Sequence, residues 1–312
     1  MLLLLIDVMI LAAPLRASAA HLPDQSLHVG GADIEVSFAE ANFPLTSTAM
    51  LDWIAESASA VSEYYGRFPV PHLRVNVVLI DIGKGVVFGR TFVPGLVPVI
   101  RVLIGPVASE DDLHQDWVMT HEMVHLAFPS VPREQHWIEE GIATYVEPIA
   151  RVQIGDLTPS KVWRDMLDGM PHGLPDKGDR GLDNTHTWGR TYWGGAMFCL
   201  LADVEIHRRT QNEYGLQDAL RAIAKSGTML DDWPLTRALK AGDDAVGVPV
   251  LAELYARMKD APYDPNLPML WQRLGVNLAG DSVTFDSAAP DASIVTSIDK
   301  PRTRRLKRLK EP

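Results

Sequence analysis

The stretch His121-Glu-Met-Val-His125 decides the fold of this 312-residue chain. Residues four apart on an α-helix lie on one face, so His121 and His125 can present two imidazoles to one metal ion. Glu122 is turned by about 100° from His121, which places its carboxylate beside the ion and within reach of a water molecule. Chance alone gives this string in about 2 of 100 chains of this length, so the metal site needs a third ligand.

The next expected helix, from about Glu134 to Pro148, contains candidates for that ligand. Within it lies Trp137-Ile-Glu-Glu-Gly-Ile-Ala-Thr-Tyr145, where two acids precede small residues that let helices approach closely. A catalytic zinc ion takes three protein ligands and keeps one open position. Glu140 and Glu147 are seven apart and share a face, so one can ligate while the other accepts a hydrogen bond from a ligating imidazole. Glu139 is expected to be a solvated surface acid.

Hydrophobic patterns predict strands before residue 105 and helices after it, an α+β arrangement. The expected strands are residues 33–38, 73–80, 86–92 and 97–104. The expected helices are residues 45–65, 109–128, 134–148, 189–209, 216–225, 249–259 and 267–274, with a long loop at 169–187. Ser109 and Asp112 form a capping-box pattern at the start of the helix that contains the histidines, and Pro129 ends that helix.

Composition and charge limit the function classes. The hydrophobic share of 46% and the charged share of 22% are those of a globular protein. The last 13 residues hold seven of the 29 basic groups, which leaves a body with a net charge near −17. An acidic body disfavours nucleic acid as a partner. The single cysteine, Cys199, lies in an apolar run and is expected to be a buried hydrophobe.

The ends of the chain suggest export. Residues 1–20 are apolar and finish in Ala17-Ser-Ala-Ala20, which indicates a signal peptide or a retained anchor. We expect a sheet-bearing half at 21–155 with the zinc helices, a helical half at 156–298, and a basic disordered tail at 299–312. The protein is expected to be periplasmic or secreted. Membrane association, if it occurs, would use the N-terminal segment or the tail.

The two segments around the histidines and Glu140 resemble the paired zinc helices of the gluzincins, closest to the branch of aminopeptidase N-like enzymes and bacterial glycyl aminopeptidases. The stretch from Tyr192 to Thr210 resembles the glycyl aminopeptidase pattern Y-x-x-G-A followed by an apolar helix, an Asp and a basic end. The likeness covers roughly residues 45–298 and is strong at 121–147 and 192–210. It implies a zincin-like α+β fold, with an N-terminal mixed β-sheet and zinc-binding helices followed by a mainly helical C-terminal half.

The resemblance also implies roles for single residues. It makes Glu140 the third zinc ligand and Tyr192 the donor of a hydrogen bond to the oxyanion. The large aminopeptidases grip a substrate's free amine through an acidic motif on the strand before the zinc helix, and the corresponding stretch here has no acid. Its backbone can still pair with an extended peptide, so we expect substrate binding along this stretch. Its residues are Gly85, Val86, Val87, Phe88 and Gly89.

The expected function is that of a zinc metallopeptidase with one Zn²⁺ ion, with Glu122 as the general base and a peptide or protein as the substrate. Two alternatives stay open. One is a zincin-like protein that binds a partner without catalysis. The other is a zinc hydrolase that acts on a non-peptide amide or ester.

Overall fold

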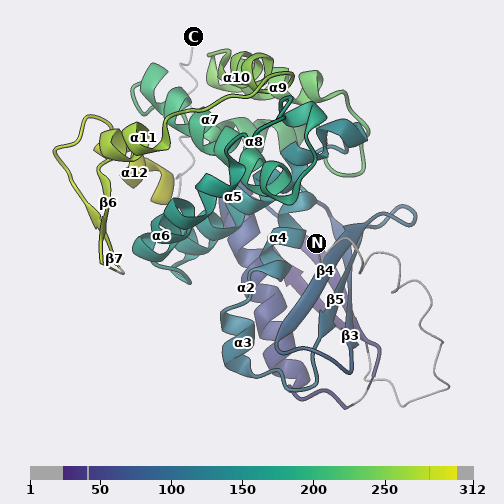
Figure 1. Ribbon diagram of the computed structural model, residues 1–312. Helices are drawn as coiled ribbons and strands as arrows, with labels where there is room; N and C mark the ends of the chain where they lie inside the picture. Colours follow the sequence, from purple (N-terminus) through teal and green to yellow (C-terminus); the bar gives the residue numbers. More distant parts are fainter. Residues whose placement is uncertain (1–23, 41, 281, 301–312) are drawn as a thin grey trace, which may run out of the picture.

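The computed structural model describes residues 24–40, 42–280 and 282–300, with a sheet at one end of the molecule and helices at the other (Figure 1). The five-stranded sheet has the order β1-β2-β3-β5-β4. Its strands are β1 Gln25–Val29, β2 Ala32–Phe38, β3 His72–Leu79, β4 Val86–Phe92 and β5 Val99–Ile104. The β1–β2 and β4–β5 pairs are antiparallel, whereas the β2–β3 and β3–β5 pairs are parallel. The sheet is therefore mixed, as predicted, and β4 lies at its edge.

Strand β2 shows why these residues form a sheet. Ile34 and Val36 are fully buried, while Glu35 between them is exposed, which is the period-two pattern of a strand with one face in the core. The hydrophobic pattern does not predict β1. Its signal is the two-residue turn Gly30-Gly31, where both φ angles are positive, a conformation typical of a tight hairpin that favours glycine.

Helix α2 (Ser47–Tyr65) packs against the sheet and against the helices that carry the histidines and Glu140. The Thr46 hydroxyl accepts a hydrogen bond from the Ala49 amide at its start, and Gly66 in the left-handed conformation ends it. The prediction of a helix at 45–65 is confirmed.

The single helix predicted at 109–128 is wrong, because the chain forms two helices there, α3 (Glu110–His114) and α4 (Val118–His125). The capping box of Ser109 and Asp112 is present at the start of α3. Asp116 then accepts hydrogen bonds from the amides of Val118 and Met119, both at 3.0 Å. A side chain that caps a new helix favours a break at this point, and the apolar spacing alone does not reveal it.

Helix α5 (His136–Ile154) runs through Pro148 and is longer than predicted. It contacts α2 and α4 on one side and α7 (Gly195–Arg209) on the other. A Cβ atom added at Gly141 would lie 2.3 Å from the Gly195 backbone, so the two glycines permit this close crossing. Gly141, which follows Glu140, therefore allows α5 to pack closely against α7.

The remainder of the described chain is mainly helical, as predicted. Its helices are α6 Pro159–Gly169, α8 Leu216–Ser226, α9 Leu235–Val246, α10 Val250–Met258, α11 Leu267–Leu274 and α12 Ala292–Asp299. The sequence analysis does not predict α6, α9 or α12. The loop expected at 169–187 contains two short 3₁₀ helices, Met170–Gly173 and Leu182–Asn184. The confinement of strands to residues before 105 is also wrong, because β6 Val276–Ala279 and β7 Ser282–Phe285 form a small hairpin.

The predicted targeting segment, residues 1–20, lies outside the described residues. Of the tail predicted at 299–312, Asp299 is the last residue of α12, and residues 301–312 lie outside the described residues. Within the ranges given above, none of the helices combines the length and the apolar character that crossing a bilayer requires.

Candidate metal centre

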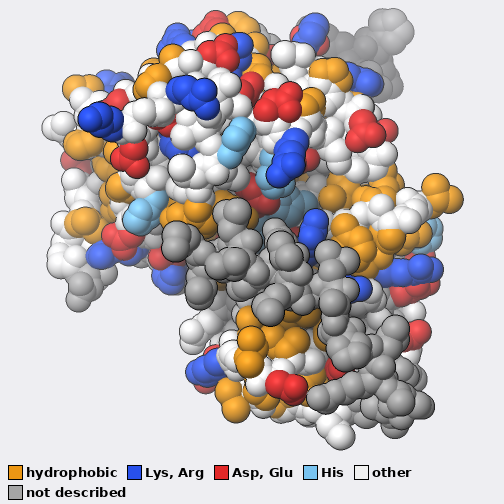
Figure 2. Space-filling model, turned by 45° about the vertical axis from the view of Figure 1, so that its right-hand side comes forward, with side chains coloured by type: hydrophobic (Ala, Val, Ile, Leu, Met, Phe, Trp, Pro, Cys, Tyr) orange, Lys and Arg blue, Asp and Glu red, His pale blue; other side chains and the backbone are white. Residues whose placement is uncertain are grey.

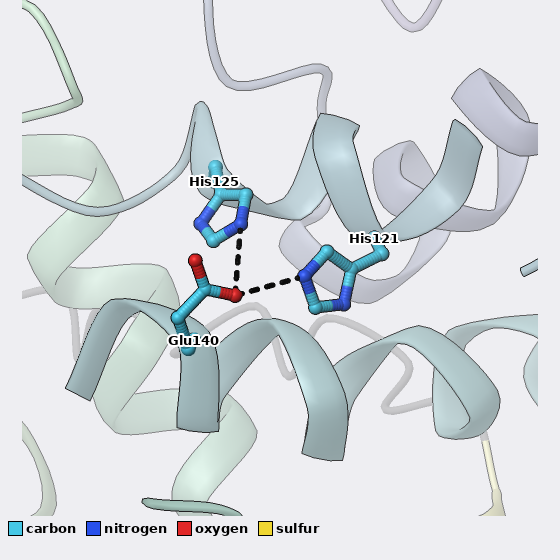
Figure 3. A group of neighbouring side chains, drawn as sticks. All are labelled: His121, His125 and Glu140. Atoms are coloured by element: carbon cyan, nitrogen blue, oxygen red, sulfur yellow. Dashed lines mark hydrogen bonds and ion pairs between the residues drawn. The ribbon is translucent and has the colours of Figure 1, made fainter. Parts of the chain in front are cut away.

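Three side chains that the sequence predicts as metal ligands converge between α4 and α5 (Figure 3). One ligand atom from each of His121, His125 and Glu140 lies within 4.8 Å of the other two. The Glu140 Oε2 atom is 3.2 Å from His121 Nε2 and 3.6 Å from His125 Nε2. Two imidazole nitrogens and one carboxylate oxygen form a donor set that zinc prefers.

The local helices explain this convergence. His121 and His125 lie one turn apart on α4, and their ring centroids are 4.9 Å from each other. Glu140 lies in the second turn of α5, which packs on α4. All three side chains are at most 12% exposed. This low exposure reduces the competition of bulk water for the three ligand atoms.

The charges of the site are strongly coupled. Burial raises the pKa of Glu140, but His125, His121 and His136 lower it by more, so the carboxylate stays ionised well below its usual range. Burial lowers the pKa of His121, but Glu140 and Glu122 raise it by more. The site therefore carries a negative charge opposite the imidazoles, an arrangement that suits a cation between them.

Glu122 belongs to α4, and its side chain lies against strand β4. The Thr91 hydroxyl is 2.7 Å from Glu122 Oε2 and 2.8 Å from the Glu122 carbonyl oxygen. A Cβ atom at Gly89 would lie 2.4 Å from Val118 Cγ1 and 2.8 Å from Glu122 Cγ, so a glycine is needed where β4 passes the helix. The sequence analysis does not identify Thr91, because its contact joins residues 31 positions apart.

The predicted substrate stretch, residues 85–89, lies at the beginning of edge strand β4. The ladder with β5 is irregular between Val86 and Phe88, and Val87 is partly exposed at this point. Strand β4 contacts α4, and Gly89 lies against Glu122. One face of β4 therefore lies against Glu122, the neighbour of His121 on α4.

Tyr192 lies next to His121, in a π-helix (Arg190–Gly194) that leads into α7. Its ring lies nearly parallel to the ring of His121, with the centroids 6.2 Å apart. The half-exposed Trp188 stacks on Tyr192 at the same centroid separation. The half-exposed Trp117 packs edge-on against His121 at 5.2 Å. Tyr192 and Trp117 therefore both contact His121.

Glu147 differs from the sequence expectation. Instead of bonding to a ligating imidazole, it accepts a hydrogen bond of 2.9 Å from Arg151, which also donates to Asp156 and to the His114 carbonyl. Burial raises the pKa of Glu147 to about 7, while Arg151 and His121 lower it. In the described structure Glu147 thus acts on His121 through its charge.

The expectation for Glu139 is wrong. Its side chain is 19% exposed and bonds to His136 at 2.6 Å, while His136 also contacts Glu140 at 3.0 Å. Hydrogen bonds to Glu139 and Glu140 are the main causes that raise the pKa of His136 to about 10. The sequence signal for these contacts was the spacing of His136 from Glu139 and Glu140, three and four positions. This signal applies only if the helix already includes residue 136.

Histidine and acidic side chains gather between the helical part of the molecule, above, and the sheet-bearing part, below (Figure 2). This position fits a site built by α4 and β4 from one part and by α5 and the π-helix from the other.

Comparisons with known proteins identify the fold. The aminopeptidase N family protein from Idiomarina loihiensis is 14% identical with a TM-score of 0.57, and the match covers 81% of this chain and 49% of that chain. An M1 zinc metallopeptidase from Deinococcus radiodurans is 14% identical with a TM-score of 0.51, and the match covers 78% and 52%. A variant of that enzyme bound to a Tyr-Ser-Ala substrate has a TM-score of 0.52 at 14% identity, with the same coverage.

The fold of this chain is similar to that of these proteins, and the predicted fold class, an N-terminal mixed sheet followed by a mainly helical half, is confirmed. The chain spans about half the length of the matched structures. No protein-family model matches the sequence, and no curated protein matches it.

Proposed function

We propose that this protein is a zinc-dependent metallopeptidase that hydrolyses peptide bonds with a glutamate general base. The observation that carries the proposal is the convergence of His121, His125 and Glu140 between two packed helices. The similarity of its fold to proteins described as M1 zinc metallopeptidases supports the proposal by analogy of fold.

The donor set fits zinc. Two imidazoles, of which that of His121 is buried, and a buried carboxylate are the kind of ligands found in many catalytic zinc sites, and three protein ligands leave one position open. When bound, zinc supplies Lewis acidity, which polarises a carbonyl and makes water nucleophilic near neutral pH.

The protein's own residues supply the proton transfers. Glu122 would take a proton from the attacking water and return it to the leaving amine. The Thr91 hydroxyl contacts Glu122 Oε2, so the other carboxylate oxygen would carry out the proton transfer. The Tyr192 hydroxyl would donate a hydrogen bond to the developing oxyanion. An extended peptide would pair with the free edge of β4 at residues 85–89.

The test is elemental analysis of protein purified without added metal, followed by cleavage of a peptide library with and without 1,10-phenanthroline. We expect about one zinc ion per chain, cleavage that stops with the chelator and resumes when zinc is added, and no cleavage by His125→Ala. Stoichiometric zinc without cleavage of any peptide would refute a peptidase and favour a non-peptide substrate or a binding role. Absence of zinc after incubation with it would refute the metal centre.

We also propose, from the sequence of residues 1–20 alone, that the protein acts outside the cytoplasm. Cell fractionation with N-terminal sequencing tests this. A mature protein that begins near residue 20 in the exported fraction is expected, and an intact N-terminus in the cytosol would contradict it.

A further inference from the structure

We propose that His136 is a positioning residue that holds the zinc ligand Glu140 in a one-oxygen binding orientation, and that Glu139 anchors His136. This inference rests on the proposed function, because it takes His121, His125 and Glu140 as the zinc ligands.

The first turn of α5 builds the arrangement. His136 is the first residue of the helix, so Glu139 and Glu140 follow at three and four positions and lie on the same side. The ring uses both nitrogens: Nδ1 is 2.6 Å from Glu139 Oε2 and Nε2 is 3.0 Å from Glu140 Oε1. An ionised carboxylate has no hydrogen to donate and can only accept hydrogen bonds. Both ring nitrogens of His136 therefore face acceptors.

Glu139 is itself anchored. Its other oxygen, Oε1, accepts a hydrogen bond of 3.3 Å from the backbone amide of Val131. A continuous chain of contacts therefore runs from the loop before α5, through Glu139 and His136, to the ligand. A backbone anchor limits how far the imidazole can move.

The two oxygens of Glu140 have separate contacts. Oε1 faces His136, while Oε2 faces His121 and His125. Rotation about the last torsion of a glutamate is soft, so an unheld carboxylate can turn or bind a metal with both oxygens. The contact at Oε1 removes this freedom and presents Oε2 alone. A ligand oriented before the metal arrives binds it more tightly, and it leaves a coordination position open for water.

The test compares zinc dissociation constants by competition with a chromophoric chelator. We expect His136→Ala to weaken zinc binding by about 10- to 100-fold, the usual effect of losing a group that orients a ligand. His136→Gln keeps one amide donor for Glu140 and should lose less than His136→Ala. Glu139→Gln should fall between wild type and His136→Ala, because the amide keeps only one of the two acceptor oxygens, loses the charge and leaves the ring.

Two control variants remove the same chemical groups elsewhere. His186→Ala removes an exposed histidine, and Glu134→Gln removes an exposed acid near the start of α5. Both should bind zinc as wild type does. Unfolding of the metal-free variants in urea checks that they fold, and His136→Gln serves if the alanine variant does not.

X-ray absorption of the zinc-loaded proteins separates positioning from ligation. Two imidazoles are expected around zinc in both wild type and His136→Ala. Three in wild type and two in the variant would make His136 a ligand and overturn the proposal. Equal zinc affinities of wild type, His136→Ala and Glu139→Gln would also overturn it while leaving the metal centre intact. A wild-type protein that binds no zinc would instead overturn the proposed function and this inference with it.

Discussion

Glu122 is buried beside the two imidazoles, with one carboxylate oxygen 2.7 Å from the Thr91 hydroxyl. In the proposed mechanism Glu122 transfers the proton through its other oxygen, and the Thr91 hydroxyl orients the carboxylate. Two substitutions separate the role of Glu122 as a base from the role of Thr91 in orienting it.

The first substitution is Glu122→Gln, which keeps the shape of the side chain and removes its basicity. We expect metal content to stay the same and kcat to fall by about 100- to 10,000-fold, the usual contribution of a general base. Zinc analysis and peptide cleavage on the same preparation check this. An unchanged kcat would remove Glu122 from the mechanism.

The second substitution is Thr91→Val, which keeps the volume and removes the hydroxyl. A hydrogen bond to a charged group contributes about 1.5 to 3 kcal/mol, so kcat should fall by about 10- to 100-fold with little change in KM. Thr91→Ser keeps the hydroxyl and should retain most of the activity. Equal rates for the Val and Ser variants would show that the hydroxyl does not hold Glu122.

At the scale of elements, the approach of α5 to α7 brings the ligand helix and the Tyr192 segment together. Gly141 and Gly195 meet with no room for a side chain. The π-helix before α7 carries Tyr192, and its Arg190 forms a buried ion pair of 2.7 Å with Asp179. Short π segments often lie at functional sites, where they change the direction of one side chain.

Gly141→Ala tests this approach. Alanine favours a helix by about 1 kcal/mol over glycine, so an isolated α5 would gain stability. Because the new Cβ would lie 2.3 Å from backbone atoms, we expect a loss of about 1 to 3 kcal/mol instead. Urea unfolding measures it. Gly95→Ala, where a Cβ meets nothing within 4 Å, is the control and should stay within about 0.5 kcal/mol of wild type.

Helix α12 docks on α6 through Asp299, which accepts a hydrogen bond of 3.0 Å from the Trp163 indole. Burial raises the pKa of Asp299 from 3.8 to about 6, against the effect of that bond. The folded protein therefore binds this proton more tightly than the unfolded chain does. The contribution of Asp299 to the free energy of unfolding is therefore fully present below pH 3.8 and is lost as the pH rises through about 6.

Asp299→Asn keeps an acceptor for Trp163 and cannot ionise. Between pH 4 and pH 7 we expect the free energy of unfolding of wild type to fall relative to this variant by at most about 3 kcal/mol. Urea unfolding of both proteins at several pH values measures the difference. Parallel pH profiles would show that Asp299 does not titrate in this range.

At the scale of the whole molecule, the candidate metal centre joins α4, which contacts the sheet, to α5, which also contacts α7. A cation bound there would link the sheet-bearing part to the helical part of the molecule. The three ligands come together only in the folded protein, so the unfolded chain would not bind the cation in this way. An ion that binds only the folded protein stabilises it according to its free concentration relative to its dissociation constant.

Removal of zinc should therefore lower Tm. With free zinc at about 1,000 times the dissociation constant, the stabilisation is about 4 kcal/mol. Calorimetry with and without chelator checks this in wild type and in His125→Ala. We expect the variant to show no chelator effect. A similar decrease of Tm in both proteins would place the stabilising ion elsewhere.

The sequence by itself determined the features that depend on local chemistry. His121 and His125 are one helical turn apart and the residues of β2 alternate, and such periodicity fixes which side chains share a face. These patterns predicted the α+β fold and the two histidine ligands. The mixed sheet and the choice of Glu140 over Glu147 as the third ligand came from the resemblance of the sequence to a known family.

The tertiary structure decided everything that joins distant segments or sets a helix boundary. The break between α3 and α4 depends on Asp116, and the position of Glu122 depends on Thr91 from another element. His136 joins Glu140 because α5 begins at that residue. Periodicity carries no information about such contacts, because each depends on the packing of elements whose separation along the chain does not determine their separation in space.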